Sequence, residues 1–345
     1  MAKLFFLVSG EHPTLPFSEL KAILDAEQHE YKVLGELRQI LRLEASVESI
    51  KSIVRRSAMT RACCIELAYC EATTAEILKK VRASALDSWI KKGDTFVARV
   101  RRIGESAPRV DTLALEEDIG AVVLEKVEGA KVKLTGPHVT LFGVLTGDKF
   151  TFGPRLAEVH PKPFVERRPR KRPFFHPSAM ASKLARCMVN LAQPVAGDVV
   201  LDPFCGTASF LIEAGLIGCR VMGFDVQRRM VRGSLRNLSF YEVSPEGMLR
   251  ADARYPPFRE VDCIVTDPPY GRSATTLGRE IGEIVSDFLS TAKGLLPKGK
   301  RICIASPKGA RTARAIKESG FRLVESHSVY VHRSLTREIA VLERI

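Results

Sequence analysis

The sequence lacks a Cys-x-x-Cys pair, and its eight cysteines are scattered along the chain. This spacing argues against a zinc site, so we predict no bound metal. No apolar run reaches the ~18 residues that a transmembrane helix needs, and we expect no association with a membrane. The first ten residues, MAKLFFLVSG, precede Glu11 and His12 instead of a small-residue cleavage site, which favours a β-strand over a signal peptide. We therefore expect a cytoplasmic protein whose cysteines stay reduced.

Acidic residues are scarce in the second half of the chain. Residues 161–345 contain 30 Lys and Arg against 18 Asp and Glu, whereas residues 1–160 contain 23 against 22. The net charge of +13 therefore lies almost wholly after residue 160. This excess favours a polyanionic partner.

The densest basic stretch is PKPFVERRPRKRPFF, residues 161–175, with six basic residues and one acid. Its four prolines indicate a boundary between domains. A solvated linker would explain the charge, but contacts to nucleic-acid phosphates fit the density of basic residues better. The residues predicted to make such contacts are Arg167, Arg168, Arg170, Lys171 and Arg172.

Before this boundary, strand-like and helix-like segments alternate loosely, which is typical of an α+β region. The expected strands cover residues 2–9, 39–45, 61–70, 94–104 and 130–136, with a strand pair at 138–150. The expected helices cover residues 16–27, 46–60 and 73–90, the last capped by Thr73 or Thr74.

After the boundary the alternation becomes regular and predicts an α/β domain with a doubly wound, mostly parallel sheet. The last two strands, 322–331 and 337–345, have only a short connection and must form an antiparallel hairpin. The other expected strands cover residues 199–204, 220–226, 247–253, 261–269 and 300–307, and the expected helices cover 177–193, 207–218, 227–241, 279–296 and 309–320.

Three acids follow successive strands of this sheet, where ligands of open α/β sheets bind. Asp202 ends the strand of VVLDPFCGTASF, in which Gly206 allows the backbone to approach a ligand closely. The segment is not G-x-G-x-x-G, and an acid there would repel a diphosphate but suits an amine. Asp225 stands where an acid accepts the ribose hydroxyls, and Asp252 where one accepts an adenine amino group. Amine, ribose and adenine together predict S-adenosylmethionine as the cofactor.

The segment TDPPY supplies the expected chemistry. The exocyclic amino group of a base is a poor nucleophile, because its lone pair is delocalised into the ring. Asp267 and the Pro268 carbonyl could hold its hydrogens, the prolines Pro268 and Pro269 would keep the site stiff, and Tyr270 offers a ring for stacking of the base. Attack by a cysteine on cytosine C5 would need Cys where Pro269 stands.

The segments HPSAMASKLARCMVNLA, LDPFCGTASFLIEA, TDPPYGRS and VHRSLTREI resemble the archaeal tRNA guanosine-10 N2-methyltransferase family. The resemblance covers residues 172–345 most specifically. It implies a Rossmann-like methyltransferase preceded by a ferredoxin-like segment and a THUMP domain. It also implies transfer of one or two methyls to N2 of a guanosine in tRNA, with no obligatory protein partner. The expected domains are residues 1–55 (ferredoxin-like), 56–157 (THUMP), 158–175 (basic linker) and 176–345 (methyltransferase).

The resemblance also implies roles for single residues. The cofactor would contact His176, Pro177, Asp202, Pro203, Gly206, Asp225, Asp252 and Ala253. The amino-group site would consist of Asp267, Pro268, Pro269 and Tyr270, and the basic residues of 167–172 would bind RNA. For His176, a structural role is an equally good interpretation. The roles of Arg333, Ser334 and Arg337, between the last two strands, stay open.

Three alternatives remain. A tRNA N2-guanine methyltransferase with another target nucleotide would have the same motifs. An adenine-N6 DNA methyltransferase shares D-P-P-Y but usually has a recognition segment in or after the catalytic domain, for which Asp252 and Asp267 leave no room. A non-catalytic RNA-binding protein on the same scaffold would tolerate loss of D-P-P-Y, which is intact here.

Overall fold

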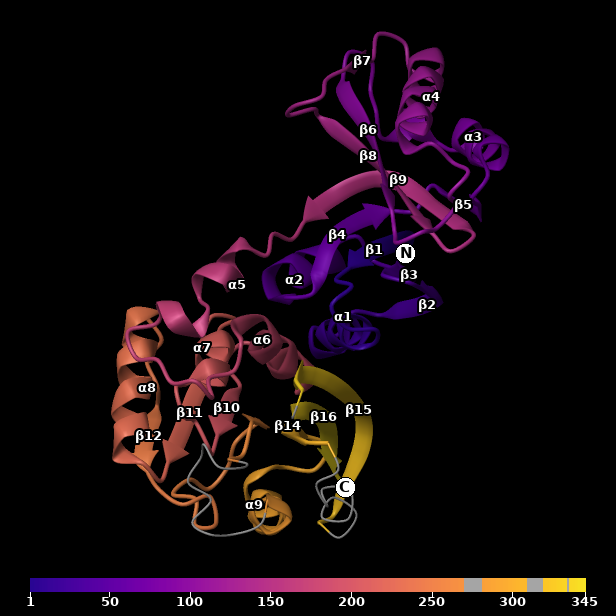
Figure 1. Ribbon diagram of the computed structural model, residues 1–345. Helices are drawn as coiled ribbons and strands as arrows, with labels where there is room; N and C mark the ends of the chain where they lie inside the picture. The colour runs from indigo at the N-terminus through magenta and orange to yellow at the C-terminus, as the bar shows by residue number, and fades with distance from the viewer. Residues whose placement is uncertain (270–280, 309–318, 334) are drawn as a thin grey trace. The chain divides into compact units, whose positions relative to one another are not determined.

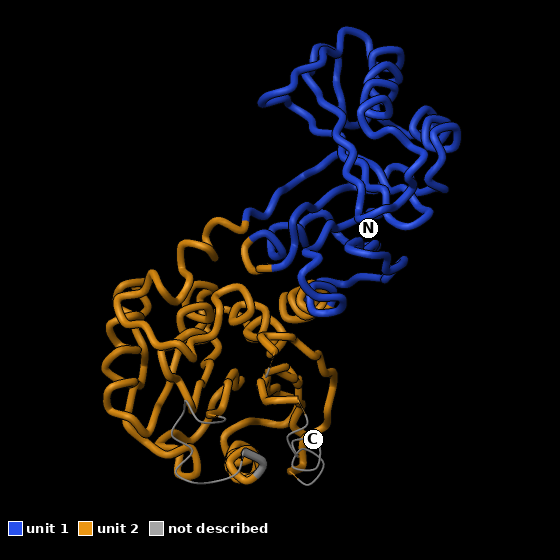
Figure 2. Tube along the Cα trace, in the orientation of Figure 1, with its two compact units in different colours: residues 1–17, 28–54, 59–160 blue, residues 18–27, 55–58, 161–345 orange. Residues whose placement is uncertain are grey.

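The computed structural model describes residues 1–269, 281–308, 319–333 and 335–345 (Figure 1). The chain forms two compact units (Figure 2). Unit 1 comprises residues 1–17, 28–54 and 59–160, and unit 2 comprises residues 18–27, 55–58 and 161–345. Unit 2 begins at residue 161 and also includes residues 18–27 and 55–58, so neither unit coincides with one of the expected domains. The finer division into four parts stays a prediction.

Unit 1, all of whose residues the structure describes, is built on a nine-stranded sheet. Its strand order is β2-β3-β1-β4-β9-β8-β6-β7, and β5 pairs with β9. The strands are β1 (Ala2–Val8), β2 (Tyr31–Leu37), β3 (Ile40–Ala45), β4 (Thr60–Ile65), β5 (Ala68–Glu71), β6 (Thr95–Arg102), β7 (Lys131–Val132), β8 (Val139–Thr146) and β9 (Lys149–Glu158).

The helices of unit 1 pack their apolar side chains on this sheet. Phe96, Phe150 and Phe152 of the strands are fully buried in one core with Ile77 of α3 and Ile119 of α4. The helical elements are α2 (Ser49–Arg56), whose last two residues belong to unit 2, α3 (Thr74–Ala83), the 3-10 turn η1 (Leu86–Ser88) and α4 (Thr112–Lys126). The Thr73 side chain caps α3, as the sequence predicted.

Unit 2 contains a seven-stranded sheet, counted over the residues that the structure describes. Its order is β12-β11-β10-β13-β14-β16-β15. Neighbours from β12 to β14 are parallel, whereas β16 is antiparallel to both β14 and β15. This confirms the predicted doubly wound sheet with a C-terminal hairpin. The strands are β10 (Val199–Asp202), β11 (Arg220–Asp225), β12 (Gly247–Arg250), β13 (Cys263–Thr266), β14 (Arg301–Pro307), β15 (Phe321–His332) and β16 (Leu335–Arg344).

Helices cover both faces of this sheet. Phe288 of α9 packs with Leu201, Phe224 and Ile264 in one core. Gly223, which precedes Phe224 and so faces the other way, lies against Leu211 of α7. Helices α7 and α9 therefore cover opposite faces. The helical elements are α5 (Lys162–Glu166), η2 (Pro169–Lys171), α6 (Ser182–Leu191), α7 (Ser209–Gly215), α8 (Arg228–Phe240) and α9 (Ile281–Leu295). The helix expected at 309–320 lies outside the described residues except for its end.

Two early segments belong to unit 2, most of α1 (Leu15–Ala26) and residues 55–58. The buried Glu19 carboxylate accepts hydrogen bonds from Asn190 Nδ2 at 3.0 Å and Ser57 Oγ at 2.8 Å. Arg56 is 2% exposed, and its guanidinium donates to the Pro194 carbonyl at 2.8 Å. Buried polar groups are stable only when they are paired, so these contacts tie the early segments to α6 and to the residues that follow it.

Two further observations concern membrane-spanning helices and the cysteines. No helix in the described ranges is long and apolar enough to cross a membrane. All eight cysteines lie in the described part of the chain, and each is a free thiol.

Candidate active site

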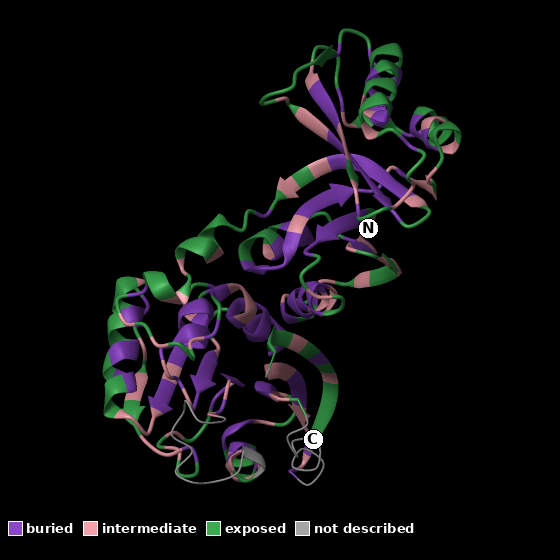
Figure 3. Cartoon of the chain, viewed as in Figure 1, coloured by how far each residue is buried: buried purple, intermediate pink, exposed green. Residues whose placement is uncertain are grey.

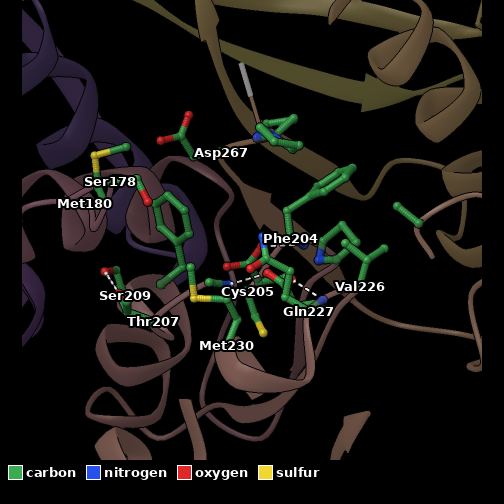
Figure 4. Close-up of a pocket in the computed structure, with 18 of the residues that line it drawn as sticks. Ser178, Met180, Phe204, Cys205, Thr207, Ser209, Val226, Gln227, Met230 and Asp267 are labelled. Carbon is green, nitrogen blue, oxygen red and sulfur yellow. Dashed lines mark hydrogen bonds between the residues drawn. The ribbon is translucent and has the colours of Figure 1, made fainter. Parts of the chain in front are cut away.

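A pocket of unit 2 lies at the carboxyl ends of β10, β11 and β13 (Figure 4). The chain runs from β10 through β11 to β12 in one direction along the sheet, and from β13 to β14 in the other. The pocket therefore lies where the strand order reverses, which is the usual ligand site of open α/β sheets. Its lining includes Asp202, Asp225, Asp252 and Asp267, so the geometry brings together all four acids that the sequence singled out.

Asp202 is the most buried of these acids, with 1% of its surface exposed. Its Oδ1 accepts hydrogen bonds from Thr266 Oγ1 at 2.7 Å and from the Phe204 N–H at 3.1 Å. Burial raises the pKa of Asp202 to about 7, although both hydrogen bonds oppose the rise. The negative charges of Asp225 and Asp267 raise this pKa further. The Asp202 carboxylate is therefore poised for a ligand that brings positive charge.

Asp225 is oriented by two backbone donors. Its Oδ2 accepts from the Gly206 N–H at 3.1 Å, and its Oδ1 accepts from the Gln227 N–H at 2.9 Å. Burial raises the pKa of Asp225, and these two bonds counteract the shift. The Gly206 N–H is thus committed to a carboxylate, so this loop is not arranged as a phosphate-binding nest.

The loop between β10 and α7 is held from the side of α8. Ser234 Oγ donates to the Gly206 carbonyl at 2.8 Å, and Asn237 Nδ2 donates to the Thr207 carbonyl at 3.0 Å. Ala208 has φ 63°, a left-handed conformation that is strained for a residue with a Cβ. Strain of this kind is kept where the surrounding structure fixes it, often at functional sites.

Asp252 faces both the pocket and the surface. Its carboxylate forms an ion pair with Arg254, with Arg254 Nη2 donating to Oδ2 at 2.7 Å. Asp252 and Ala253 both line the pocket, as do Pro203 and Gly206. Contact of Asp252 with an adenine amino group stays a prediction.

Asp267 has a partner that the sequence did not assign. Arg337 Nη2 of β16 lies 3.3 Å from Asp267 Oδ2, and both side chains are largely buried, at 13% and 14% exposure. Arg337 also lies 3.9 Å from the sulfur of Met180. In Figure 4 the Asp267 carboxylate projects toward Ser178 and Met180 on the pocket wall. Pro268 and Pro269 line the pocket beside it. Tyr270 and Ser334 lie outside the described residues.

The two residues expected to flank the cofactor before α6 differ in position. His176 lines the pocket, and its Nδ1 lies 2.7 Å from Ser178 Oγ. Pro177 is exposed and is absent from the lining of the pocket as the structure describes it. The chain turns outward at this proline, and the expected contact with Pro177 is not supported by the geometry.

The basic segment corrects a further expectation. Arg172 is 5% exposed and donates to Ser209 Oγ at 2.7 Å and Ser182 Oγ at 3.1 Å. Arg167 donates from Nε and Nη2 to the two carboxylate oxygens of the fully buried Glu213, at 2.9 and 3.0 Å. These two guanidiniums hold the fold of unit 2 and are not placed to bind RNA. Arg168, Arg170 and Lys171 are exposed and keep their expected role as a prediction.

Several residues that line the pocket were given no role from the sequence. Phe204, Met230 and Phe288 add apolar walls, and Gln227 and Arg337 add polar groups. A flat apolar wall beside carboxylates suits a ligand with an aromatic ring and polar ends.

Comparisons with known proteins agree with this site. Residues 169–339 match the family described as RMKL-like, methyltransferase domain, and residues 71–153 match the THUMP domain. The tRNA (guanine(10)-N2)-dimethyltransferase of Methanothermobacter thermautotrophicus is 39% identical, over 99% of this chain and 100% of that protein. The chain belongs to this family. This chain is also 31% identical to the tRNA (guanine(6)-N2)-methyltransferase of Thermus thermophilus, over 72% of this chain and 75% of that protein.

A solved structure supports the fold of the methyltransferase. TrmN from Thermus thermophilus superposes with a TM-score of 0.58 at 23% identity, over 99% of this chain and 100% of that chain. The resemblance predicted from the sequence is thereby confirmed, together with the Rossmann-like methyltransferase fold.

Proposed function

We propose that this protein transfers one and then a second methyl group from S-adenosylmethionine to N2 of guanosine 10 in tRNA. The observation that carries the proposal is the pocket itself. It places Asp267 and Pro268, suited to an amino group, on the same wall as Asp202 and Asp225, suited to the cofactor. The names of the full-length relatives supply the position in tRNA.

The donor set of the pocket fits this cofactor. Asp202, buried and beside two further acids, would hold the cofactor's amino group, because a positive charge relieves the repulsion. Asp225, held by two backbone N–H groups, would accept hydrogen bonds from the ribose hydroxyls. When bound, the cofactor supplies a methyl group on a sulfonium, which is electrophilic. The apolar walls at Phe204 and Met230 exclude water from this region.

Asp267 would act on the guanine amino group. Its carboxylate and the Pro268 carbonyl would accept hydrogen bonds from the two hydrogens of N2 and favour a pyramidal nitrogen, whose lone pair is then available for attack. As the new N–C bond forms, the bond between the methyl carbon and sulfur would break and leave a neutral thioether, while the nitrogen becomes positive and loses one proton. The Asp267 carboxylate stabilises that charge and is placed to accept the proton, an effect larger in the transition state than in the ground state.

Arg337 would position the acid. A guanidinium 3.3 Å from Oδ2 holds the Asp267 carboxylate in place. The position of the Asp267 Oδ2 atom is thus set by the protein before the substrate binds.

The decisive experiment is incubation of unmodified tRNA transcripts with the protein and S-adenosylmethionine. Nuclease digestion and mass spectrometry then map each methyl group. We expect monomethyl and then dimethylguanosine at position 10, and far less product with the Asp267→Asn variant over the same time. Methylation of a base other than guanine would overturn the proposal.

Guanosine 6 is the second candidate target, because the Thermus thermophilus relative with that name is 31% identical over 72% of this chain. The pocket does not distinguish the two positions, since both offer the same amino group. The mapped nucleotide separates them directly.

A further inference from the structure

Helix α8 presents a basic face to solvent that the proposed chemistry does not use. Its exposed residues include Arg228, Arg229, Arg232 and Arg236, and the helix contains no Asp or Glu. Figure 3 shows the outer side of α8 as exposed along most of its length. In the described part of the chain, no ion pair involves any of these four arginines. The buried side carries Met230, Val231 and Leu238 and the fold needs only that side.

This arrangement is unfavourable for the helix alone. Arg228 and Arg229 occupy the first turn, where the helix dipole disfavours positive charge. Arg228, Arg232 and Arg236 follow one another at four-residue spacing, and like charges at that spacing repel. A polyanion lying along the face would remove both penalties. Four-residue spacing corresponds to a rise of about 6 Å between successive guanidinium-bearing residues.

The basic face connects two regions already described. At one end, Gln227 caps α8 and lines the pocket. Along the helix, the chain after η2 is bound to it. Asn237 accepts from the Phe174 N–H at 2.9 Å and donates to the Phe174 carbonyl at 2.9 Å, and a Cβ on Gly233 would overlap the Phe174 ring.

The exposed residues of the basic segment therefore adjoin α8. Arg168, Arg170 and Lys171 precede Phe174 by a few residues, and the Arg229 guanidinium lies 5.8 Å from the centre of the Phe174 ring. The chain then continues to His176 at the pocket. Exposed cations thus run from η2 along α8 to the pocket.

We propose that the exposed face of α8 binds the phosphate backbone of the RNA whose base enters the pocket. The inference rests on the proposed function and adds a surface to it. A nucleic-acid strand fits better than an acidic protein, because the cations form a regular row that ends at the site where a base must be presented. Arginine is well suited to this contact, since its planar donors match phosphate oxygens.

The test is a triple variant, Arg229→Gln, Arg232→Gln and Arg236→Gln, measured for tRNA binding by fluorescence anisotropy between 50 and 200 mM salt. Each lost phosphate contact lowers the slope of log affinity against log salt by roughly 0.7–0.9, so we expect a total loss of about 2. The midpoint of thermal unfolding should stay unchanged or rise, because glutamine is a good helix former and the repulsion is gone. Weaker binding in a protein that is no less stable is a result that a purely structural role of α8 would not give.

Two controls sharpen this result. The variant Arg259→Gln, Lys293→Gln and Lys298→Gln removes the same charge from exposed positions elsewhere in unit 2 and should keep most of the slope. Replacement of the three α8 arginines by lysine should restore most of the affinity. An equal slope loss in both glutamine variants would overturn the proposal in favour of net charge, and an unchanged slope in the α8 variant would assign this face to a partner other than RNA. Mapping the methylated nucleotide with the wild-type protein tests the proposed function separately.

Discussion

Unit 2 contains two clusters of buried charge that differ in their balance. In the first, on α6 and α7, Glu213 lies between Arg167 and Arg186, with oxygen–nitrogen distances of 2.9 Å to each. In the second, at the strand ends, Asp202, Asp225 and Asp267 line one pocket, and the guanidinium of Arg337 lies beside Asp267. In the first cluster each charged group contacts a group of opposite charge, whereas in the second negative charges predominate.

The difference indicates that buried charges stabilise the fold in the first cluster and serve ligand binding in the second. In the first cluster, burial lowers the pKa of Arg186 and Arg172, and the Glu213 carboxylate opposes this fall in both. In the second, burial and neighbouring acids raise the pKa of Asp202, and no cation of the first cluster compensates it. A site that keeps repelling charges together is poised for a ligand of opposite charge. The two clusters should therefore respond differently to removal of one charge.

The largest effect on folding is expected for Glu213→Gln. It leaves the guanidiniums of Arg186 and Arg167 in the interior without their carboxylate, and breaking a buried ion pair in this way costs about 3–5 kcal/mol. Urea unfolding measures the loss. The matched control is Glu246→Gln, whose partner Arg220 is half-exposed, and it should cost far less, because exposed ion pairs contribute little to stability. Equal losses in the two variants would refute the distinction between the clusters.

Asp267→Asn should cost much less stability than Glu213→Gln, because it also removes a negative charge that repels Asp202, which offsets the lost pair with Arg337. The side chain keeps its shape but loses the charge that stabilises the developing cation. We expect single-turnover methylation to slow by roughly 10²–10³-fold, as for loss of one preorganised electrostatic group. Affinities for tRNA and cofactor should change little. A variant with the wild-type rate would show that the segment is a turn without a catalytic role.

The sequence predicted this site because its signals are local. Each of Asp202, Asp225 and Asp267 follows an apolar strand directly, and parallel strands bring their carboxyl ends to one edge. Arg337 was beyond reach for the opposite reason. It meets Asp267 through the antiparallel register of β16 on β14, where Arg337 pairs with Pro307, and no spacing in the sequence encodes that register.

The wrong role given to Arg167 and Arg172 and the failure to predict helix α4 from the sequence have different origins. A run of arginines does not reveal which side chains turn inward. Arg167 binds Glu213, 46 residues away, and Arg172 binds Ser209, but the sequence pattern assigned both to RNA.

Helix α4, by contrast, has a signal in the sequence. Leu115, Ile119 and Val122 follow helical spacing after the cap at Asp111, and a closer search for caps finds it.

Asp225→Ala tests the cofactor side of the acidic cluster. The carboxylate is held by two backbone N–H groups and would accept charge-assisted bonds from the ribose, so its loss should weaken cofactor binding by about 1.5–3 kcal/mol. Calorimetry on the folded variant measures this. Unchanged affinity would remove Asp225 from the cofactor site.

Arg337→Gln should have a smaller effect on the chemical step than Asp267→Asn. It leaves the acid in place but removes the positive charge that positions it, and we expect roughly tenfold slower single-turnover methylation, near the lower end for a bond to a charged group. Arg337→Lys keeps the positive charge beside Asp267 and should recover part of the rate. No recovery with lysine would indicate that Arg337 only packs against Met180.

The smallest change to the protein is a change of pH alone, which acts through Asp202. Its pKa of about 7 lies well above the usual value, so in the free protein the group binds a proton as pH falls below 7. This proton stabilises the folded state at low pH, and that contribution is lost as pH rises through 7. A cofactor whose amino group pairs with the charged carboxylate must displace the proton. Affinity should therefore fall with decreasing pH below 7, by at most tenfold per unit, while the cofactor's amino group stays charged up to about pH 7.5.

Calorimetry between pH 5.5 and 7.5, in buffers of different ionisation enthalpy, measures both the affinity and the protons released. Below pH 7 we expect release of up to one proton per cofactor bound. The Asp202→Asn variant should bind more weakly and with no such dependence, since its amide does not titrate. The cluster around Glu213 provides the contrast, because Glu213→Gln should leave the pH dependence of cofactor binding unchanged. Flat affinity in the wild-type protein over this range would mean that the cofactor's amino group lies away from Asp202.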